Sequence, residues 1–306
     1  RASLASHEGS RTWLLARALR EFGISSEIVF AKNDPFSADP NFPPHFGRFL
    51  HSLLIAHAKS SDKKAEDIWI DADIAGPPLP PGRISPELRG RNAIHEDGSI
   101  TPLPVFESGE TKDEIDLRVT VDERGDAKGQ VTVLLRGRSA QSLSGVLERI
   151  VGEERQRVLR GVALAWVPFA NVDTVQLSSS EGSWQVAIRA ELSIPGFAQV
   201  EGTKVRSWVV QGVDPIHAVF PRPYVATLGA TYASKKGRES ALAVNEASQY
   251  HLRRRIALPK GSTLAKLPGP FEVDSPLLRA SRKIAVNGET IEEDFSLTLS
   301  TGTIGK

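Results

Sequence analysis

The sequence of 306 residues contains no cysteine and no methionine. Without cysteine, the chain forms no disulfide bond and no thiolate metal site, and it offers no thiol nucleophile of its own. This absence does not decide the redox compartment, because exported and intracellular proteins can both lack cysteine. Because the sequence starts at Arg1 and has no methionine anywhere, we expect it to be an internal part of a longer protein.

The sequence also lacks a charge imbalance and long apolar runs. Its 38 basic and 37 acidic residues give a formal net charge of +1, so no net field attracts nucleic acid or a membrane surface. No segment approaches the roughly 20 apolar residues of a transmembrane helix. With 40% hydrophobic and 25% charged residues, the composition is that of a globular protein with a sizeable core, and the length predicts about two domains.

The first third of the sequence mixes helical and strand patterns. Residues 11–22 place apolar side chains on one face of a helix. A proline-rich segment at residues 33–44 cannot be a helix or a central strand, so we expect a loop there. The strand patterns are at residues 28–30, 52–56 and 67–71.

Four features occur in a characteristic order: a helix that starts after Gly9, a Gly23-Ile24 turn at its end, then His51, then Trp69-Ile70-Asp71. This pattern resembles the core of the transglutaminase-like superfamily, whose papain-type site consists of Cys, His and Asp in that order. The resemblance covers residues 1–105 and continues more weakly through the rest of the chain. It is to the bacterial multidomain branch of the family, whose members have a β-rich C-terminal domain.

The resemblance implies a site without its nucleophile. The family's cysteine lies about fifteen positions before the glycine of the turn, which is Glu8 when counted from Gly23. The triad-remnant positions are therefore Glu8, His51 and Asp71. A second departure follows the aspartate, where the family usually has Pro-Thr and this chain has Ala and Asp at residues 72–73.

These departures favour a protein without catalytic activity. A carboxylate at the position of Glu8 is a weak nucleophile, and it would pair with His51 instead of being activated by it. We therefore expect a non-catalytic binding or scaffold module of a larger exported bacterial protein, the export being implied by the resemblance alone. The alternative is a hydrolase or acyl transferase that uses Ser10, or a cysteine outside this sequence, together with His51 and Asp71.

The same resemblance implies where a partner binds. The old substrate cleft would be covered by the loop of residues 33–48 and would accept a protein or an extended peptide. We expect no cofactor, no nucleic acid and no transmembrane segment. For Trp69 we expect burial against the first helix as its main role. The candidate cleft residues are Phe36, Phe42, His45, Phe46 and Trp69.

The remaining two thirds of the sequence predict a β-rich domain. From residue 114 apolar and polar residues alternate, as in half-buried strands, and similar patterns recur to residue 299. A helical segment interrupts them at about residues 139–165, with Ser139 as a plausible N-cap. The predicted class is α+β: a truncated transglutaminase-like lobe at 1–105, including a proline-rich linker at about 76–104, and a β-sandwich domain of roughly eight strands at 106–306.

Two further clusters are better explained by structure than by function. His45, His51 and His57 recur every six residues, a spacing that does not place imidazoles regularly on one face, so we predict no metal site. The run of arginines at residues 253–255 could form a phosphate patch. Alternate residues of a strand face opposite sides, however, so we interpret the run as an exposed edge strand protected against pairing.

Overall fold

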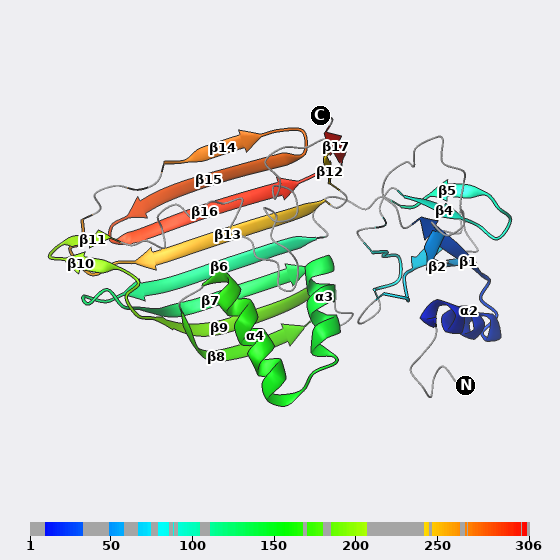
Figure 1. Cartoon of the computed structure of the whole chain (residues 1–306), viewed down its shortest axis with the longest axis horizontal. Coiled ribbons are helices and arrows are strands. Elements are labelled where there is room, and N and C mark those ends of the chain that lie inside the picture. Colours follow the sequence, from blue (N-terminus) through cyan, green and yellow to red (C-terminus); the bar gives the residue numbers. More distant parts are fainter. Residues whose placement is uncertain are drawn as a thin grey trace. The chain divides into compact units, whose positions relative to one another are not determined.

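The computed structural model divides into two compact units. Unit 1 comprises Arg1–Glu107 with Gly182–Trp184, and unit 2 comprises Ser108–Glu181 with Gln185–Lys306. Among the described residues, sheets predominate and three helices occur, which confirms the predicted α+β class (Figure 1). No helix in this part of the chain is long and apolar enough to cross a membrane. The structure describes residues 10–32, 49–57, 67–74, 79–85, 88, 91–104, 111–167, 170–179, 185–206, 242–244, 247–263, 267, 269–300 and 302–304.

Unit 1 contains one helix and an antiparallel sheet of five described strands. The strand order is β3-β2-β1-β4-β5, so the longest strand, β2, lies between β1 and β3. The described elements are α2 (Arg11–Glu21), β1 (Ser26–Lys32), β2 (Phe49–His57), β3 (Asp67–Ile70), β4 (Asn92–Ile94) and β5 (Ile100–Pro102).

Helix α2 ends in a Schellman motif, which explains the Gly23-Ile24 sequence. Gly23 has φ 72°, a left-handed conformation that costs glycine little. The Gly23 amide donates to the carbonyl of Arg20 at 3.0 Å, and the Ile24 amide donates to the carbonyl of Leu19 at 2.9 Å. Two carbonyls of the last turn are thereby satisfied, and the chain is directed into β1.

The two faces of the unit 1 sheet pack against different partners. Helix α2 covers the face of Leu54, where Ala16 and Ile28 are also buried. Residues of opposite parity, such as Leu53, contribute to a second cluster on the other face. Trp69 packs against this second cluster, so the expectation that it packs against the helix is wrong. Because side chains alternate along β3, Ile70, and not Trp69, lies on the side of the sheet that α2 covers.

Unit 2 is built on one eight-stranded sheet, with strand order β14-β15-β16-β13-β6-β7-β9-β8. Neighbouring strands are antiparallel except β13 and β6, which are parallel. Two short antiparallel pairs, β10 with β11 and β12 with β17, are separate from it. The elements are β6 (Lys112–Val121), β7 (Ala127–Arg136), α3 (Arg138–Leu147), α4 (Gly152–Trp166), β8 (Asn171–Ser179), β9 (Gln185–Ile194), β10 (Gln199–Glu201), β11 (Lys204–Arg206), β12 (Leu242–Val244), β13 (Ser248–Ala257), β14 (Phe271–Asp274), β15 (Leu278–Asn287), β16 (Thr290–Leu299) and β17 (Gly302–Ile304).

The core of unit 2 lies on one face of this sheet. Alternate residues of β6, including Ile115 and Leu117, are buried with Leu143 of α3 and Leu159 of α4. Both helices cover the β7, β9 and β8 part of the sheet (Figure 1). The predicted sandwich of two stacked sheets is therefore replaced, among the described residues, by a single sheet with helices on its apolar face. Both arrangements bury every second residue of a strand, so alternation alone cannot distinguish them.

The helical segment begins differently from the prediction. The residue that caps α3 is Gly137, with φ 66°, and it makes no side-chain capping bond. Ser139 instead lies in the first turn, and its hydroxyl donates to Asp113 of β6 at 3.1 Å. The hydroxyl thus ties the helix to the sheet rather than to its own backbone.

Candidate functional site

The N-terminus of α2 is occupied by a carboxylate from the segment after β3. The hydroxyl of Ser10 donates to Oδ2 of Asp73 at 2.5 Å, and the amide of Arg11 donates to Oδ1 at 2.5 Å. The amide of Thr12 donates to the same Oδ1 at 3.2 Å. Ser52 of β2 adds a fourth donor, its hydroxyl lying 2.5 Å from Oδ2. Asp73 therefore joins the first turn of the helix, strand β2 and its own segment.

These contacts lower the pKa of Asp73. Partial burial of the carboxyl group raises its pKa, but the hydrogen bonds from Ser10, Ser52 and Thr12 together outweigh burial and hold the pKa below its ordinary value. The partial positive charge of a helix N-terminus acts in the same direction. Asp73 is thus a stable anion at the position where α2 concentrates its free amide donors.

His51 is held by a fully buried carboxylate. Nε2 of His51 lies 2.8 Å from Oδ1 of Asp71, whose side chain has no exposed surface. The other oxygen of Asp71 accepts the amide of Ser85 at 2.9 Å. An ionised carboxylate only accepts, so the hydrogen bond requires the ring to carry a proton on Nε2. The predicted pairing of His51 with Asp71 is thus present, and it is an orienting arrangement of the kind found in catalytic triads.

Ser10 is not placed as a nucleophile. It is the N-cap of α2, and its oxygen accepts the amide of Trp13 at 3.4 Å. A serine hydroxyl has one proton, and here the proton is directed to Asp73 rather than to His51. Activation as a nucleophile requires that proton to face a base whose pKa is near neutrality. The low pKa of Asp73 makes it a poor base for this purpose.

Several predicted site residues lie outside the described part of the chain. Glu8, which corresponds to the family's cysteine position, is among them. So are the cleft-loop candidates Phe36, Phe42, His45 and Phe46. Of the predicted residues, the structure therefore places Ser10, His51, Trp69 and Asp71, and it brings His51 and Asp71 into direct contact.

Two further described histidines of unit 1, His57 and His95, each pair with one carboxylate. Nδ1 of His57 lies 2.7 Å from Asp67, the residue opposite it across β2 and β3. Nδ1 of His95 lies 3.1 Å from Glu27. Within the described ranges, no three His, Asp or Glu side chains are grouped to bind a metal ion.

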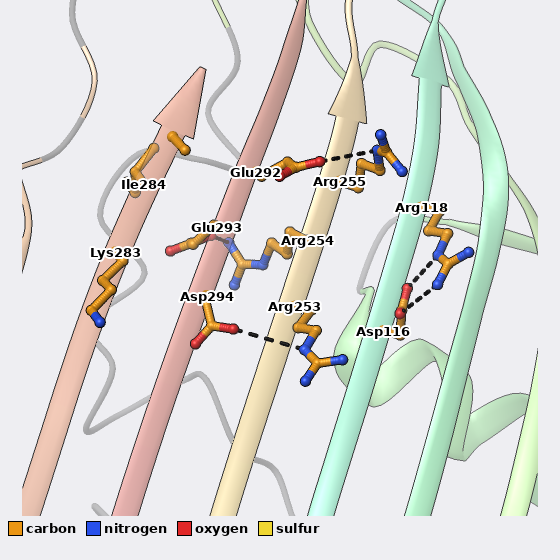
Figure 2. A pocket seen from close by; sticks show the side chains of 11 residues that line it. Asp116, Arg118, Arg253, Arg254, Arg255, Lys283, Ile284, Glu292, Glu293 and Asp294 are labelled. Carbon is orange, nitrogen blue, oxygen red and sulfur yellow. Dashed lines mark hydrogen bonds and ion pairs between the residues drawn. The ribbon is translucent and has the colours of Figure 1, made fainter. Parts of the chain in front are cut away.

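A second candidate site is a charged groove on the sheet of unit 2. It has a volume of about 360 Å³ and runs across β6, β13, β16 and β15. Figure 2 shows that its charged side chains come in opposite-sign neighbours. Among the described residues that line the groove, there is no serine, threonine or histidine. The lining residues are Asp116, Arg118, Arg253, Arg254, Arg255, Lys283, Ile284, Ala285, Glu292, Glu293 and Asp294.

The arginine run of this groove belongs to a central strand. Residues 253–255 lie in β13, which pairs with β16 on one side and β6 on the other, so the edge-strand interpretation is wrong. Arg253 faces Asp294 at 3.7 Å and Arg255 faces Glu292 at 3.3 Å, both on the exposed face (Figure 2). These cross-strand ion pairs neutralise most of the charge that would attract a phosphate.

Sequence reasoning missed the residues that organise the first site. In the sequence, Asp73 stands out only as a departure from the family's Pro-Thr, and Ser52 only as part of a strand pattern. The available signal was the pair of short polar residues Ser10 and Thr12 at the start of a helix. The first amide groups of a helix have no partner within it, so an acceptor near these residues could be expected. Nothing in the sequence indicated that Ser85 would complete the hydrogen bonds of Asp71.

Comparisons with known proteins add little to this geometry. No family model and no curated protein matches the chain. One similar solved structure is a protein from Parabacteroides distasonis named as a candidate protease, with 11% sequence identity and a TM-score of 0.47. The match covers 99% of this chain and 40% of the other, so this chain spans less than half the length of that protein. A likeness of this size carries no argument about fold or function.

Proposed function

We propose that unit 1 is a transglutaminase-like lobe that has lost its catalytic activity, and that the chain serves as a binding or scaffold module of a larger exported bacterial protein. The retained part is the pair of His51 and Asp71 in the order and proximity that the family requires. The lost part is the nucleophile, since the chain contains no cysteine.

The observation that supports inactivity is the carboxylate of Asp73 at the start of α2. In a Cys-His site, a helix N-terminus lowers the pKa of the thiol and stabilises negative charge that forms during the reaction. Here the amides of Arg11 and Thr12 already bind an anion of the same chain. A second negative charge developing beside Asp73 would be repelled, so the site opposes the chemistry it resembles.

Covalent probes test the absence of activity. The whole chain is incubated with a fluorophosphonate and assayed for hydrolysis and for amine transfer to a glutamine-containing peptide, and the variants Ser10→Ala and His51→Ala serve as comparisons. We expect no labelling and no turnover above that of the two variants. Wild-type labelling that disappears in both Ser10→Ala and His51→Ala would establish the hydrolase or acyl transferase instead.

The binding function is proposed for the predicted cleft loop of residues 33–48, with a protein or extended peptide as partner. The support is its sequence: aromatic residues and prolines between two strands of a fold whose cleft accepts extended chains. Binding to a peptide array is compared for the whole chain, a deletion of residues 35–47 and the variant Glu8→Ala. We expect the deletion to abolish binding and Glu8→Ala to retain it. Equal binding by all three proteins would refute the assignment to this loop.

A further inference from the structure

Strand β8 lies at one edge of the eight-stranded sheet, as far as the described residues go. It pairs with β9 on one side and is the last strand in the sheet order. Within the part of the chain that the structure describes, no backbone hydrogen bond crosses the outer side of β8. The outward-facing amide and carbonyl groups of this nine-residue strand, which belong to alternate residues, therefore have no backbone partner among the described residues and form a template on which a further strand can pair.

The edge lacks the features that usually prevent such pairing. Residues 174–178 contain no charge, no proline and no glycine. The one bulge of β8 lies before this run, between Val172 and Thr174. The opposite edge, β14, is different, because it has only four residues and carries Glu272 and Asp274. In the described part of the chain, the β14 edge of the sheet is thus short and charged, whereas the β8 edge is long and has no pairing strand.

The apolar face of β8 is also incompletely covered. Val175 and Leu177 pack against the core but are only half-buried. Their cross-strand partners on β9, Ala190 and Ile188, have no exposed surface. A strand added beside β8 would extend the apolar face by one row and cover these two side chains.

The sequence of β8 is complementary to itself in an antiparallel arrangement. When Gln176 is placed opposite Gln176 of a second copy, Val175 meets Leu177 and Thr174 meets Ser178. Residues directly opposite each other share a face, so the apolar pairs fall on the core side and the polar pairs on the exposed side. No charge meets a like charge within the run.

We propose that the chain forms a symmetric dimer in which β8 pairs antiparallel with β8 of a second copy, joining the two sheets into one. The contact has a two-fold axis at Gln176, as an interface between identical surfaces requires. This assembly goes beyond the proposed function and does not depend on it. We favour a second copy of this chain over a strand from a different protein, because residues 174–178 are complementary to themselves.

The absence of cysteine permits a direct test of the register. In the proposed dimer, the two Cα atoms at position 176 are about 4.5–5.5 Å apart, within the range that a disulfide bond spans. We expect the Gln176→Cys variant of the whole chain to form a disulfide-linked dimer under mild oxidation. The control Glu272→Cys, on β14 at the other edge, should form no disulfide-linked dimer, because its two sulfurs lie far from the proposed contact. Equal crosslinking of both variants, or none at position 176, would overturn the proposal.

A charge exchange tests the same contact without a covalent bond. Gln176 is exposed on the face away from the core, so substitutions there leave the fold intact. We expect Gln176→Lys and Gln176→Glu each to be monomeric by light scattering, because like charges would lie opposite each other at the axis. An equimolar mixture of the two should restore the dimer mass. A wild-type chain that is monomeric at every concentration up to the highest soluble one would overturn the proposal.

Discussion

Asp73 is the residue on which the start of α2 depends, and its replacement by asparagine provides a sharp test. An amide offers one acceptor oxygen, whereas Asp73 accepts from Ser10, Arg11, Thr12 and Ser52. At least one donor loses its partner, so we expect Asp73→Asn to destabilise unit 1 at pH 7 by about 1–2 kcal/mol. Hydrogen exchange of the α2 amides measures the loss.

The pH dependence of this penalty follows from the lowered pKa of Asp73. A carboxyl group with a lower pKa in the folded state stabilises the fold above its unfolded pKa of about 3.9, and the contribution is lost as pH falls through the folded pKa. The difference between wild type and Asp73→Asn should therefore shrink below about pH 4. Glu21→Gln, an exposed site at the other end of α2, serves as the control and should have little effect. A penalty that is constant from pH 7 to pH 3 would contradict a charged Asp73.

For single residues, the sequence predicted a contact between two side chains but not a network of several hydrogen bonds. The contact of His51 with Asp71 followed from the order of residues in a family pattern, because His51 lies in β2 and Asp71 directly follows the neighbouring strand β3. The four donors on Asp73 could not be predicted, since they come from two segments, the start of α2 and strand β2, whose approach to Asp73 depends on the tertiary fold. Trp69 was assigned to the wrong face because period two gives relative faces along a strand, and not which face the helix covers.

Among the elements, strand β13 explains why three consecutive arginines are compatible with the middle of a sheet. Arg253 and Arg255 extend from one face, and Arg254 lies on the other. The side chains of Arg254 and Glu293 are only 13% and 10% exposed, and their Nη1 and Oε2 atoms are 3.1 Å apart. Arg253 is 63% exposed and 3.7 Å from its partner Asp294.

The same substitution at two neighbouring arginines should therefore have very different effects. We expect Arg254→Met to lower the free energy of unfolding by about 3 kcal/mol, because it leaves the largely buried Glu293 without its counter-charge. Arg253→Met should change it by less than about 1 kcal/mol, as for other exposed ion pairs. Urea denaturation of both variants measures the difference. Similar losses at the two positions would show that the exposed and buried pairs are equivalent.

The existence of most elements could be predicted, whereas their arrangement could not. Alternation located β6, β7, β9 and β13, and a 3.6-residue period located the helices. The sandwich was predicted in place of a single sheet because buried alternate residues do not reveal whether a second sheet or a helix covers them. The edge position of the arginine run failed for a related reason: charge is a frequent sign of an edge strand, but cross-strand carboxylates on β16 permit it in the interior.

In the whole molecule, β6 is the strand that connects the two halves of the large sheet. It is the first strand of unit 2 in sequence, but it lies between β13 and β7, and its pairing with β13 is parallel. Such a non-local neighbour could not be predicted from the sequence pattern, which identifies strands and short hairpins but not long-range partners. The apolar residues of β6 belong to the same core cluster as those of β7, β9, β13 and β16.

This central position predicts where unit 2 can be separated from the rest of the chain. A fragment of residues 108–306 retains every strand of the eight-stranded sheet, so we expect the amides of β7 and β13 to exchange as slowly in this fragment as in the whole chain. A fragment of residues 122–306 lacks β6, which leaves β13 and β7 without a shared neighbour. It also lacks the four buried apolar side chains of β6, so the core residues that pack against them become exposed. That fragment should exchange rapidly in both strands. Equal protection in the two fragments would mean that β6 is dispensable and that the halves of the sheet fold independently.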